Sequence, residues 1–172
     1  MRQLNPSAPL INANLIDFLE DFRVRLMNQA LSSAGLAIGS SSKAKVKIAN
    51  TVAFLNNGVF KSKTTAEVAF TATTHDIAAD ASAVQEAVYL VCLAADGTPS
   101  LTMGEIASGA GNAEVPETPS GKTPIGYLRL AVAAGSTKFD ASTDELDAAH
   151  LTDTYVDLGF FNNSFEEVVS FE

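Results

Sequence analysis

An unbroken apolar run at residues 88–93, VYLVCL, constrains the fold of this chain more than any other feature. The run is short enough for a strand buried on both faces and too short for an independent helix. Asp96 and Gly97 follow it and provide the positive φ values that a tight hairpin turn needs. Leu101 and Met103 then alternate with polar neighbours. Residues 87–103 therefore predict a β-hairpin whose first strand is the central strand of an all-β domain.

Residues 125–132 form the only other segment dense enough in apolar side chains to pack beside that strand. Its alternation places Leu128, Leu130 and Val132 on one face, and Tyr127 and Arg129 on the other. We expect the two segments to be neighbours in one sheet.

Further strands are predicted from shorter alternating segments. Residues 51–55 and 59–63 flank Asn56-Asn57-Gly58, a strong hairpin signal. We expect another strand at 66–71 and a brief one at 155–158, and an edge strand or docking tail at 165–171. The glycine- and proline-containing residues 107–122 predict a long surface loop. Seven or eight short strands indicate a mainly β fold, an antiparallel β-sandwich or a small barrel.

One long amphipathic helix is predicted ahead of these strands. Asn12 is a good N-cap and Gly35 a natural C-terminal cap. Between them, large apolar residues recur at helical spacing, with Ala30 after them, and form a stripe that must be buried. The stripe packs across its own β-domain or docks on a partner or on further copies of the chain. The candidate contact residues are Leu15, Phe18, Leu19, Phe22 and Leu26.

The small, polar sequence GSSSKAKVK at residues 39–47 predicts a linker. We therefore divide the chain into an N-terminal arm with its helix (1–38), the linker (39–47) and an antiparallel β-domain (48–172). Lys43, Lys45 and Lys47, with two lysines at 61 and 63, form a local basic cluster. Edge strands carry such lysines to block unwanted strand addition, and an acidic partner is the alternative reading.

The charge balance of the chain limits its partners. Eleven basic and twenty acidic residues give a formal charge of −9, which repels phosphate backbones and anionic lipid. We therefore expect neither nucleic acid nor membrane as a partner, and no apolar stretch approaches the roughly 20 residues that span a bilayer. The start of the chain lacks a signal-peptide profile, and Cys92 in the central strand is expected to be a buried structural thiol. A reducing cytoplasm fits these features.

No motif predicts catalysis, a cofactor or a metal. Gly121-Lys122-Thr123 resembles the end of a phosphate-binding loop, but Pro116 stands where that motif needs its first glycine. Asp140, Ser142 and Asp144 have the odd spacing of a calcium loop, but the turn glycine and the final glutamate of that loop are replaced. His75 and His150 are the only histidines, and neither has a nearby second ligand. The expected protein is not an enzyme.

Several phrases in the β-domain resemble those of bacteriophage virion proteins. They cover residues 49–158 and include NNG in the first hairpin, PIGYL at 124–128, TDELDA at 143–148 and TYVDL at 154–158. The resemblance implies a fold and no catalytic residue. The virion proteins that these phrases resemble are similar to capsid decoration and head-fibre proteins, and also to parts of tail appendages.

The resemblance implies a non-enzymatic virion component. A capsid decoration (cement) or head-fibre protein on the particle exterior is the first hypothesis. A tail-fibre or receptor-binding module that uses the loop at 107–122 is the second, and a glycan-active enzyme is a distant third. The expected partners are other virion proteins such as the major capsid protein, and further copies of the chain. The need for a partner follows from the apolar stripe, which must be buried. The number of copies, three, is what the resemblance implies.

Overall fold

The computed structural model describes residue 23 and residues 26–159, and eleven strands lie within this part of the chain. Every pairing between them is antiparallel. The strands are β1 (Gln29–Ala30), β2 (Leu36–Ile38), β3 (Lys45–Ile48), β4 (Val52–Asn56), β5 (Val59–Lys63), β6 (Ala66–Ala69), β7 (Gln85–Leu93), β8 (Pro99–Met103), β9 (Ala107–Ser108), β10 (Thr123–Val132) and β11 (Leu151–Asp157). The predicted mainly β, antiparallel fold is confirmed.

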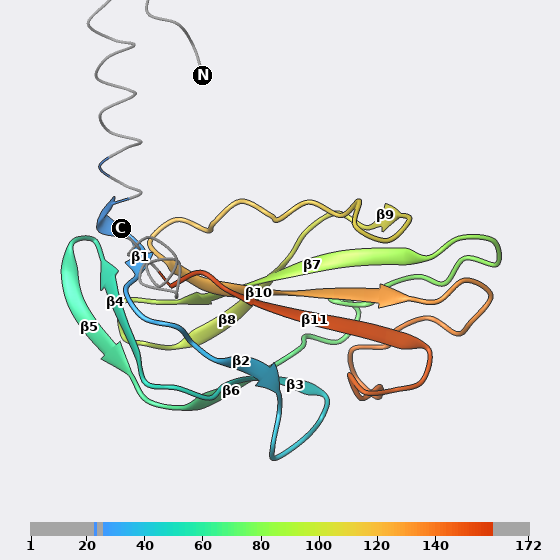
Figure 1. Ribbon diagram of the computed structural model, residues 1–172, viewed down its shortest axis with the longest axis horizontal. Coiled ribbons are helices and arrows are strands. Elements are labelled where there is room, and N and C mark those ends of the chain that lie inside the picture. The colour runs from blue at the N-terminus through green and yellow to red at the C-terminus, as the bar shows by residue number, and fades with distance from the viewer. Residues whose placement is uncertain (1–22, 24–25, 160–172) are drawn as a thin grey trace, which may run out of the picture.

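Strand β7 is central, as its apolar run predicted. It pairs with β10 along one edge and with β8 and β9 along the other, and β11 completes the sheet beyond β10. Every residue of β7 after Gln85 is buried. Figure 1 shows β7, β10 and β11 running side by side along the length of the molecule. The strand needs apolar side chains on both faces because both faces are covered.

The predicted face of β10 is also confirmed. Leu128, Leu130 and Val132 are buried in the core, whereas Tyr127 and Arg129 lie on the opposite, partly exposed face. Thr123 begins this strand. A phosphate-binding loop would instead lead into a helix after Gly121-Lys122, so the fold departs from that motif here.

The first six strands form a three-stranded meander that is interrupted halfway along. β1 pairs with β4 and β4 with β5, whereas β2 pairs with β3 and β3 with β6. Each course of the meander is therefore two strands joined by a short irregular segment. At the interruption, the Ala53 N–H donates to Ser32 Oγ (2.9 Å) and the Asn50 N–H donates to the Ala34 carbonyl (3.0 Å).

The carboxylate of Asp157, at the end of β11, holds the interrupted meander against the larger sheet. It accepts hydrogen bonds from Ser33 Oγ (2.6 Å), the Gly35 N–H (3.0 Å) and the Leu36 N–H (3.1 Å). The opposite side of the meander lies beside β8 through β6. One hydrophobic core fills the space between the meander and the sheet, and its largest fully buried members include Tyr89, Phe54 and Phe139.

The two predicted hairpins form, with one difference in turn chemistry. In the β4–β5 turn both Asn57 (φ 50°) and Gly58 (φ 73°) adopt positive φ, as a type I′ turn requires. In the β7–β8 turn only Gly97 has positive φ (80°). Asp96 uses its carboxylate instead, accepting hydrogen bonds from the Thr98 N–H (2.9 Å) and the Thr98 hydroxyl (2.8 Å).

The prediction for the C-terminal end of the helix is wrong. Residues 29–30 and 36–38 are strands β1 and β2, because β1 pairs with β4 and β2 with β3. Gly35 has a positive φ (58°), but it lies in the irregular segment between two strands and caps no helix. Arg23, Leu26 and Met27 have helical backbone, and most of the predicted helix lies outside the described residues.

The expected linker at 39–47 contains the connection from β2 to β3 and the first residues of β3. The expected helical turn near 143–149 is a series of turns, and the predicted 165–171 strand lies outside the described residues. No helix within the described residues is long and apolar enough to cross a membrane.

Candidate functional site

The apolar stripe predicted as a contact surface ends within the described part of the chain. Leu15, Phe18, Leu19 and Phe22 lie outside it, and Leu26 lies inside, with 45% of its surface exposed. The next residue, Met27, is fixed to the β4–β5 hairpin, because its carbonyl accepts a hydrogen bond from the Gly58 N–H (2.9 Å). The structure thus brings the end of the stripe to the tip of this hairpin.

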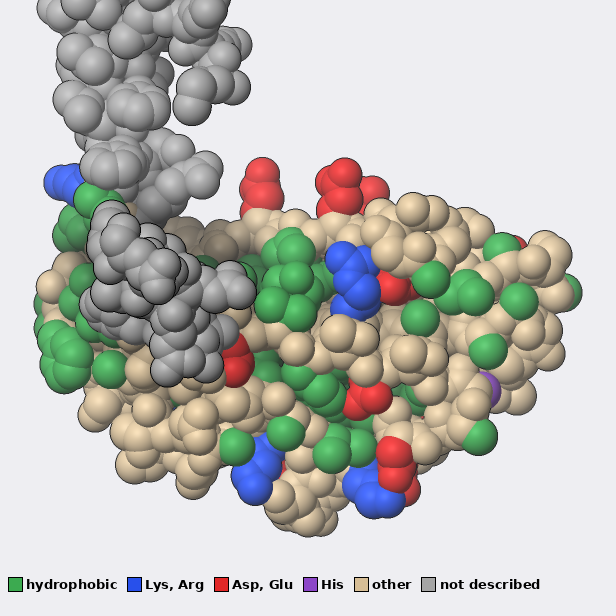
Figure 2. All heavy atoms as spheres, viewed as in Figure 1, with side chains coloured by type: hydrophobic (Ala, Val, Ile, Leu, Met, Phe, Trp, Pro, Cys, Tyr) green, Lys and Arg blue, Asp and Glu red, His purple; other side chains and the backbone are tan. Residues whose placement is uncertain are grey.

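Strand β5 continues this apolar surface. Val59 and Phe60 are 56% and 66% exposed, although both are large hydrophobic residues. β5 is the outer strand of its sheet, paired only with β4 among the described strands. Lys61 follows directly and is partly exposed. In Figure 2, hydrophobic side chains gather at the end of the molecule where Figure 1 places β5.

We call Leu26, Val59, Phe60 and Lys61 the β5 surface. Isolated hydrophobic residues on a protein surface are normal, but several together at one edge mark a contact site more often than chance. The segment VFKSK carries a signal for this in its sequence. Its two adjacent apolar residues break the alternation of a strand with one buried face, so at least one of them must be exposed or covered by another molecule.

A groove of about 680 Å³ lies between the end of β8, β9 and the first part of the loop that leads to β10. Ile106 and Val115, 42% and 46% exposed, contribute apolar surface to it together with Met103 and Pro116. Three exposed glutamates surround these side chains: Glu105, Glu114 and Glu117. We call this the loop groove. Its lining residues from Ala107 onward belong to the surface loop that the sequence predicted at 107–122, but the first two residues of that range form strand β9.

A smaller cavity of about 310 Å³ lies over β7, β10 and β11 and is lined mostly by alanine and threonine. Its charged members are Glu86 and Arg129, whose Oε2 and Nη1 atoms are 2.6 Å apart. Glu86 also accepts hydrogen bonds from the Gly111 N–H (2.9 Å) and the Ala113 N–H (3.2 Å). The pair therefore ties the loop after β9 to the sheet. Sequence reasoning missed it, since nothing local links residues 43 positions apart.

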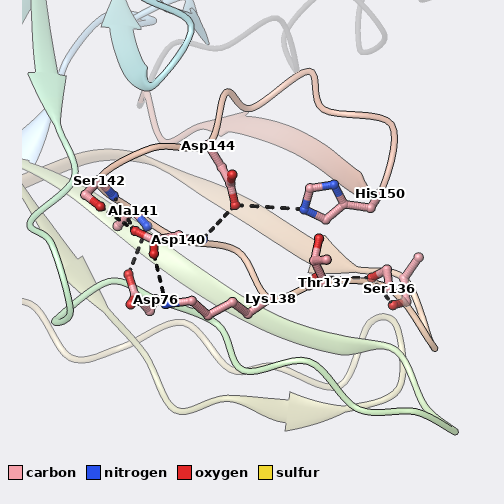
Figure 3. A network of polar contacts seen from close by, with 10 residues as sticks. Asp76, Ser136, Thr137, Lys138, Asp140, Ala141, Ser142, Asp144 and His150 are labelled. Carbon is pink, nitrogen blue, oxygen red and sulfur yellow. Dashed lines mark hydrogen bonds and ion pairs between the residues drawn. The ribbon is translucent and has the colours of Figure 1, made fainter.

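The acidic segment around Asp140 forms a polar network that ties its loop to the segment around Asp76 (Figure 3). Lys138 pairs with Asp76 (3.3 Å) and Asp140 (2.9 Å). Asp140 also accepts hydrogen bonds from the hydroxyl and N–H of Ser142, and Asp144 accepts one from the Asp140 N–H (2.7 Å). The hydrogen bond from the Ser142 hydroxyl, with the neighbouring Lys138, lowers the pKa of Asp140 to about 2.

These carboxylates are engaged by Lys138, by the Ser142 hydroxyl and by backbone N–H groups. The Oδ2 atom of Asp144 lies 3.9 Å from the Nε2 atom of His150. This Nε2 atom is buried and has no hydrogen-bond partner. Among residues 23 and 26–159, no three histidine, cysteine or acidic side chains are placed to hold a metal. The arrangement supports a structural role for this network.

The other two candidate reactive residues are in the core. His75 is buried, and its Nδ1 atom accepts a hydrogen bond from the Thr71 N–H (2.8 Å). Burial lowers its pKa. Cys92 is fully buried, as predicted, and burial raises its pKa to about 11. A thiol with so high a pKa is a poor nucleophile at neutral pH.

Comparison with known proteins adds no relative. No family model, no curated protein and no solved structure matches the chain.

Proposed function

We propose that this protein is a non-enzymatic structural component of a bacteriophage virion, a capsid decoration (cement) or head-fibre protein on the particle exterior. The observation that carries the proposal is the position of the β5 surface. The exposed Leu26 continues the apolar stripe predicted at residues 15–26, and Val59 and Phe60 extend it onto the β-domain. One end of the molecule therefore offers apolar surface for association.

Two further features support a structural role. The antiparallel sheets enclose one core, which fits a β-sandwich, and the resemblance of residues 49–158 to virion proteins falls on this part of the chain. The polar clusters are engaged in holding loops: Asp140 accepts from Ser142, and Glu86 accepts from Gly111 and Ala113. The proposed partners are the major capsid protein and further copies of the chain, with no nucleic acid or membrane.

We infer that the chain self-associates, as a homotrimer. Each large apolar side chain of the stripe is worth roughly 1.5–3 kcal/mol when fully buried, so a partner for the stripe is favourable. Several weak contacts of one trimer with a symmetric particle add up, since the second and third bind at high effective concentration. In light scattering, the full chain should have three times the 18.0 kDa mass of one copy.

A pair of variants tests the role of the stripe in this association. Leu26→Glu should lower the mass toward that of a monomer, because it puts a charge into the apolar contact. Thr143→Glu, a substitution at an exposed position in the loop before β11, should leave the trimer intact. A wild-type monomer at micromolar concentration would refute the self-association and leave the virion location to be tested separately.

The location is tested by labelling virions of the phage that encodes the chain. A gold-labelled antibody to the chain should decorate the heads, and a particle carrying the Leu26→Glu variant should lose that label while the Thr143→Glu particle keeps it. Label confined to the tail tips would replace the decoration proposal with the tail-appendage function. The virion proposal fails altogether when purified particles carry no label and the chain remains in the lysate.

A further inference from the structure

Two exposed surfaces of the chain are complementary in charge and similar in apolar character. The β5 surface combines Val59 and Phe60 with Lys61. The loop groove combines Ile106 and Val115 with three glutamates. An apolar strand with a lysine is the kind of ligand that an apolar groove rimmed by carboxylates recognises.

The charged side chains of the two surfaces form no ion pairs with other residues in the described part of the chain. Lys61 forms no ion pair there, and neither do Glu105, Glu114 and Glu117. Some other charges are paired there, such as Lys43 with Asp147 and Lys138 with Asp140, whereas Lys63 and Glu145 also lack an ion pair. The charges left without an ion pair therefore include those of the two complementary surfaces.

The two surfaces lie on different parts of the molecule. Figure 1 places β5 at one end, whereas the loop between β8 and β10 runs along the upper side and over β7. Figure 2 shows acidic side chains projecting from that upper side. The hydrogen bonds of the hairpin tip to Met27, and of the loop to Glu86, hold each surface in its place. The β5 surface and the loop groove of one copy therefore do not meet each other.

We propose that the β5 surface of one copy docks into the loop groove of a second copy of this chain. Neighbouring residues of a strand point to opposite faces, so Phe60 lies on one face of the inserted edge, and Val59 and Lys61 lie on the other. The two apolar side chains contact Ile106 and Val115, and Lys61 lies among the glutamates of the groove. The outer edge of β5, where the described strands supply no partner, faces the neighbouring copy. The proposal rests on the self-association proposed above and names the β-domain surfaces that take part in it.

A contact between two different surfaces is heterologous, and it closes into a ring when the rotation between copies fits. In a ring of three, each copy gives one β5 surface and one loop groove, so that no copy of either surface remains exposed. This arrangement also explains why an outer strand carries two adjacent large apolar residues, which would otherwise favour aggregation.

Charge reversal in the full-length protein tests the contact. Lys61→Glu should place like charges together and raise the dissociation constant of the oligomer by about tenfold or more. The double variant Glu114→Lys with Glu117→Lys should do the same from the other side. The variant that combines all three substitutions should regain most of the wild-type affinity, because opposite charges meet again. Analytical ultracentrifugation at 0.05 and 0.5 M NaCl measures all of these constants, and the wild-type association should weaken at high salt.

Matched controls change the same charges at other places. Lys47→Glu on β3 and Glu145→Lys in the loop before β11 should leave the dissociation constant within twofold of the wild-type value. Phe60→Ser provides a second variant without a charge change, and it should weaken association as Lys61→Glu does. Circular dichroism spectra that match the wild type show that each variant folds.

The outcomes separate this inference from the proposals on which it rests. Two results would overturn the contact and leave self-association through the stripe intact. One is a dissociation constant that neither charge reversal changes, and the other is a combined variant that binds no more tightly than the single reversals. A wild-type monomer would overturn both the contact and the self-association. Loss of binding to phage heads by the Glu114→Lys, Glu117→Lys variant, with an unchanged oligomer, would assign the loop groove to a capsid protein and overturn the second copy as its occupant.

Discussion

Arg129 Nη1 lies 2.6 Å from Oε2 of Glu86, so an ion pair joins β10 to β7 on the face of the sheet away from the core. Glu86 is only 3% exposed, and the same carboxylate accepts two backbone hydrogen bonds from the loop after β9. Removal of the charge would leave the partly buried Arg129 guanidinium and the backbone N–H groups of Gly111 and Ala113 with weaker partners. This pair therefore stabilises the sheet and also fixes the loop that forms one wall of the loop groove.

The first prediction concerns this carboxylate. Glu86→Gln should lower the free energy of unfolding by about 1–3 kcal/mol, because hydrogen bonds to a charged acceptor are replaced by weaker ones. Urea denaturation followed by circular dichroism measures the change. Glu114→Gln, at an exposed position of the same loop, should stay within about 0.5 kcal/mol of the wild type. Equal stability of the two variants would mean that the Glu86 pair does not hold the loop.

The second prediction concerns the β4–β5 turn. Gly58 and Gly121 have nearly equal positive φ values, 73° and 72°, which side chains adopt at a cost of about 1–2 kcal/mol. Gly58→Ala and Gly121→Ala should therefore both lower the unfolding free energy by that amount. An added methyl at Gly58 would lie 3.1 Å from Met27 Cε, whereas one at Gly121 meets nothing within 4 Å.

The flexible end of Met27 can move aside, so we expect the two losses to agree. A much larger loss at Gly58, measured by thermal unfolding, would show that Met27 is held rigidly on the hairpin. A Gly58→Ala variant as stable as the wild type would contradict the type I′ turn itself.

The third prediction concerns pH. Burial lowers the pKa of His75 below its ordinary 6.5, and its Nδ1 atom already accepts the Thr71 N–H. The folded protein therefore binds this proton less readily than the unfolded chain. The neutral His75 side chain therefore contributes stability to the folded protein that is fully present above about pH 6.5, the pKa in the unfolded chain. This contribution is lost as the pH falls through the lower pKa of the folded protein.

Unfolding experiments at pH 7.5 and 5.5 should thus give lower stability at the lower pH, and His75→Gln should reduce the difference. An NMR titration reads the folded pKa of His75 directly. A value above 6.5 would reverse the sign of the effect and contradict the buried, neutral imidazole.

The fourth prediction concerns Cys92. Because the thiol is fully buried and its pKa is raised to about 11, it should react with a thiol reagent only when the protein unfolds. Native protein at pH 8 should show no rapid reaction, and protein in urea should react completely. Rapid labelling of the native form would place Cys92 outside the core.

The sequence predicted those parts of the fold whose signals are local. The run in β7 is apolar at every position because both of its faces are covered, and Asn57-Gly58 specifies its turn through backbone conformation alone. Strand β1 was missed because Ala30 suits a helical stripe as well as a buried strand position. Its pairing with Phe54, 24 residues away, decided the outcome.

The candidate surfaces were only partly accessible to such reasoning. Leu26 was identified from helical spacing, and the structure shows that its side chain is exposed. Its role in a contact stays a prediction. The contribution of Val59 and Phe60 depends on β5 being an outer strand, which follows from the pairing order and not from the segment itself. The pair of Glu86 and Arg129 depends on the register between β7 and β10, which places Arg129 opposite Val88.

Cryo-electron microscopy of the intact phage particle is the most direct test of the proposed function. The account predicts density for this β-domain on the outside of the capsid, in groups of three, with the β5 end of each copy in contact with a neighbour or with the shell. Particles whose capsid exterior lacks this density, or that carry it only on the tail, would contradict the proposal.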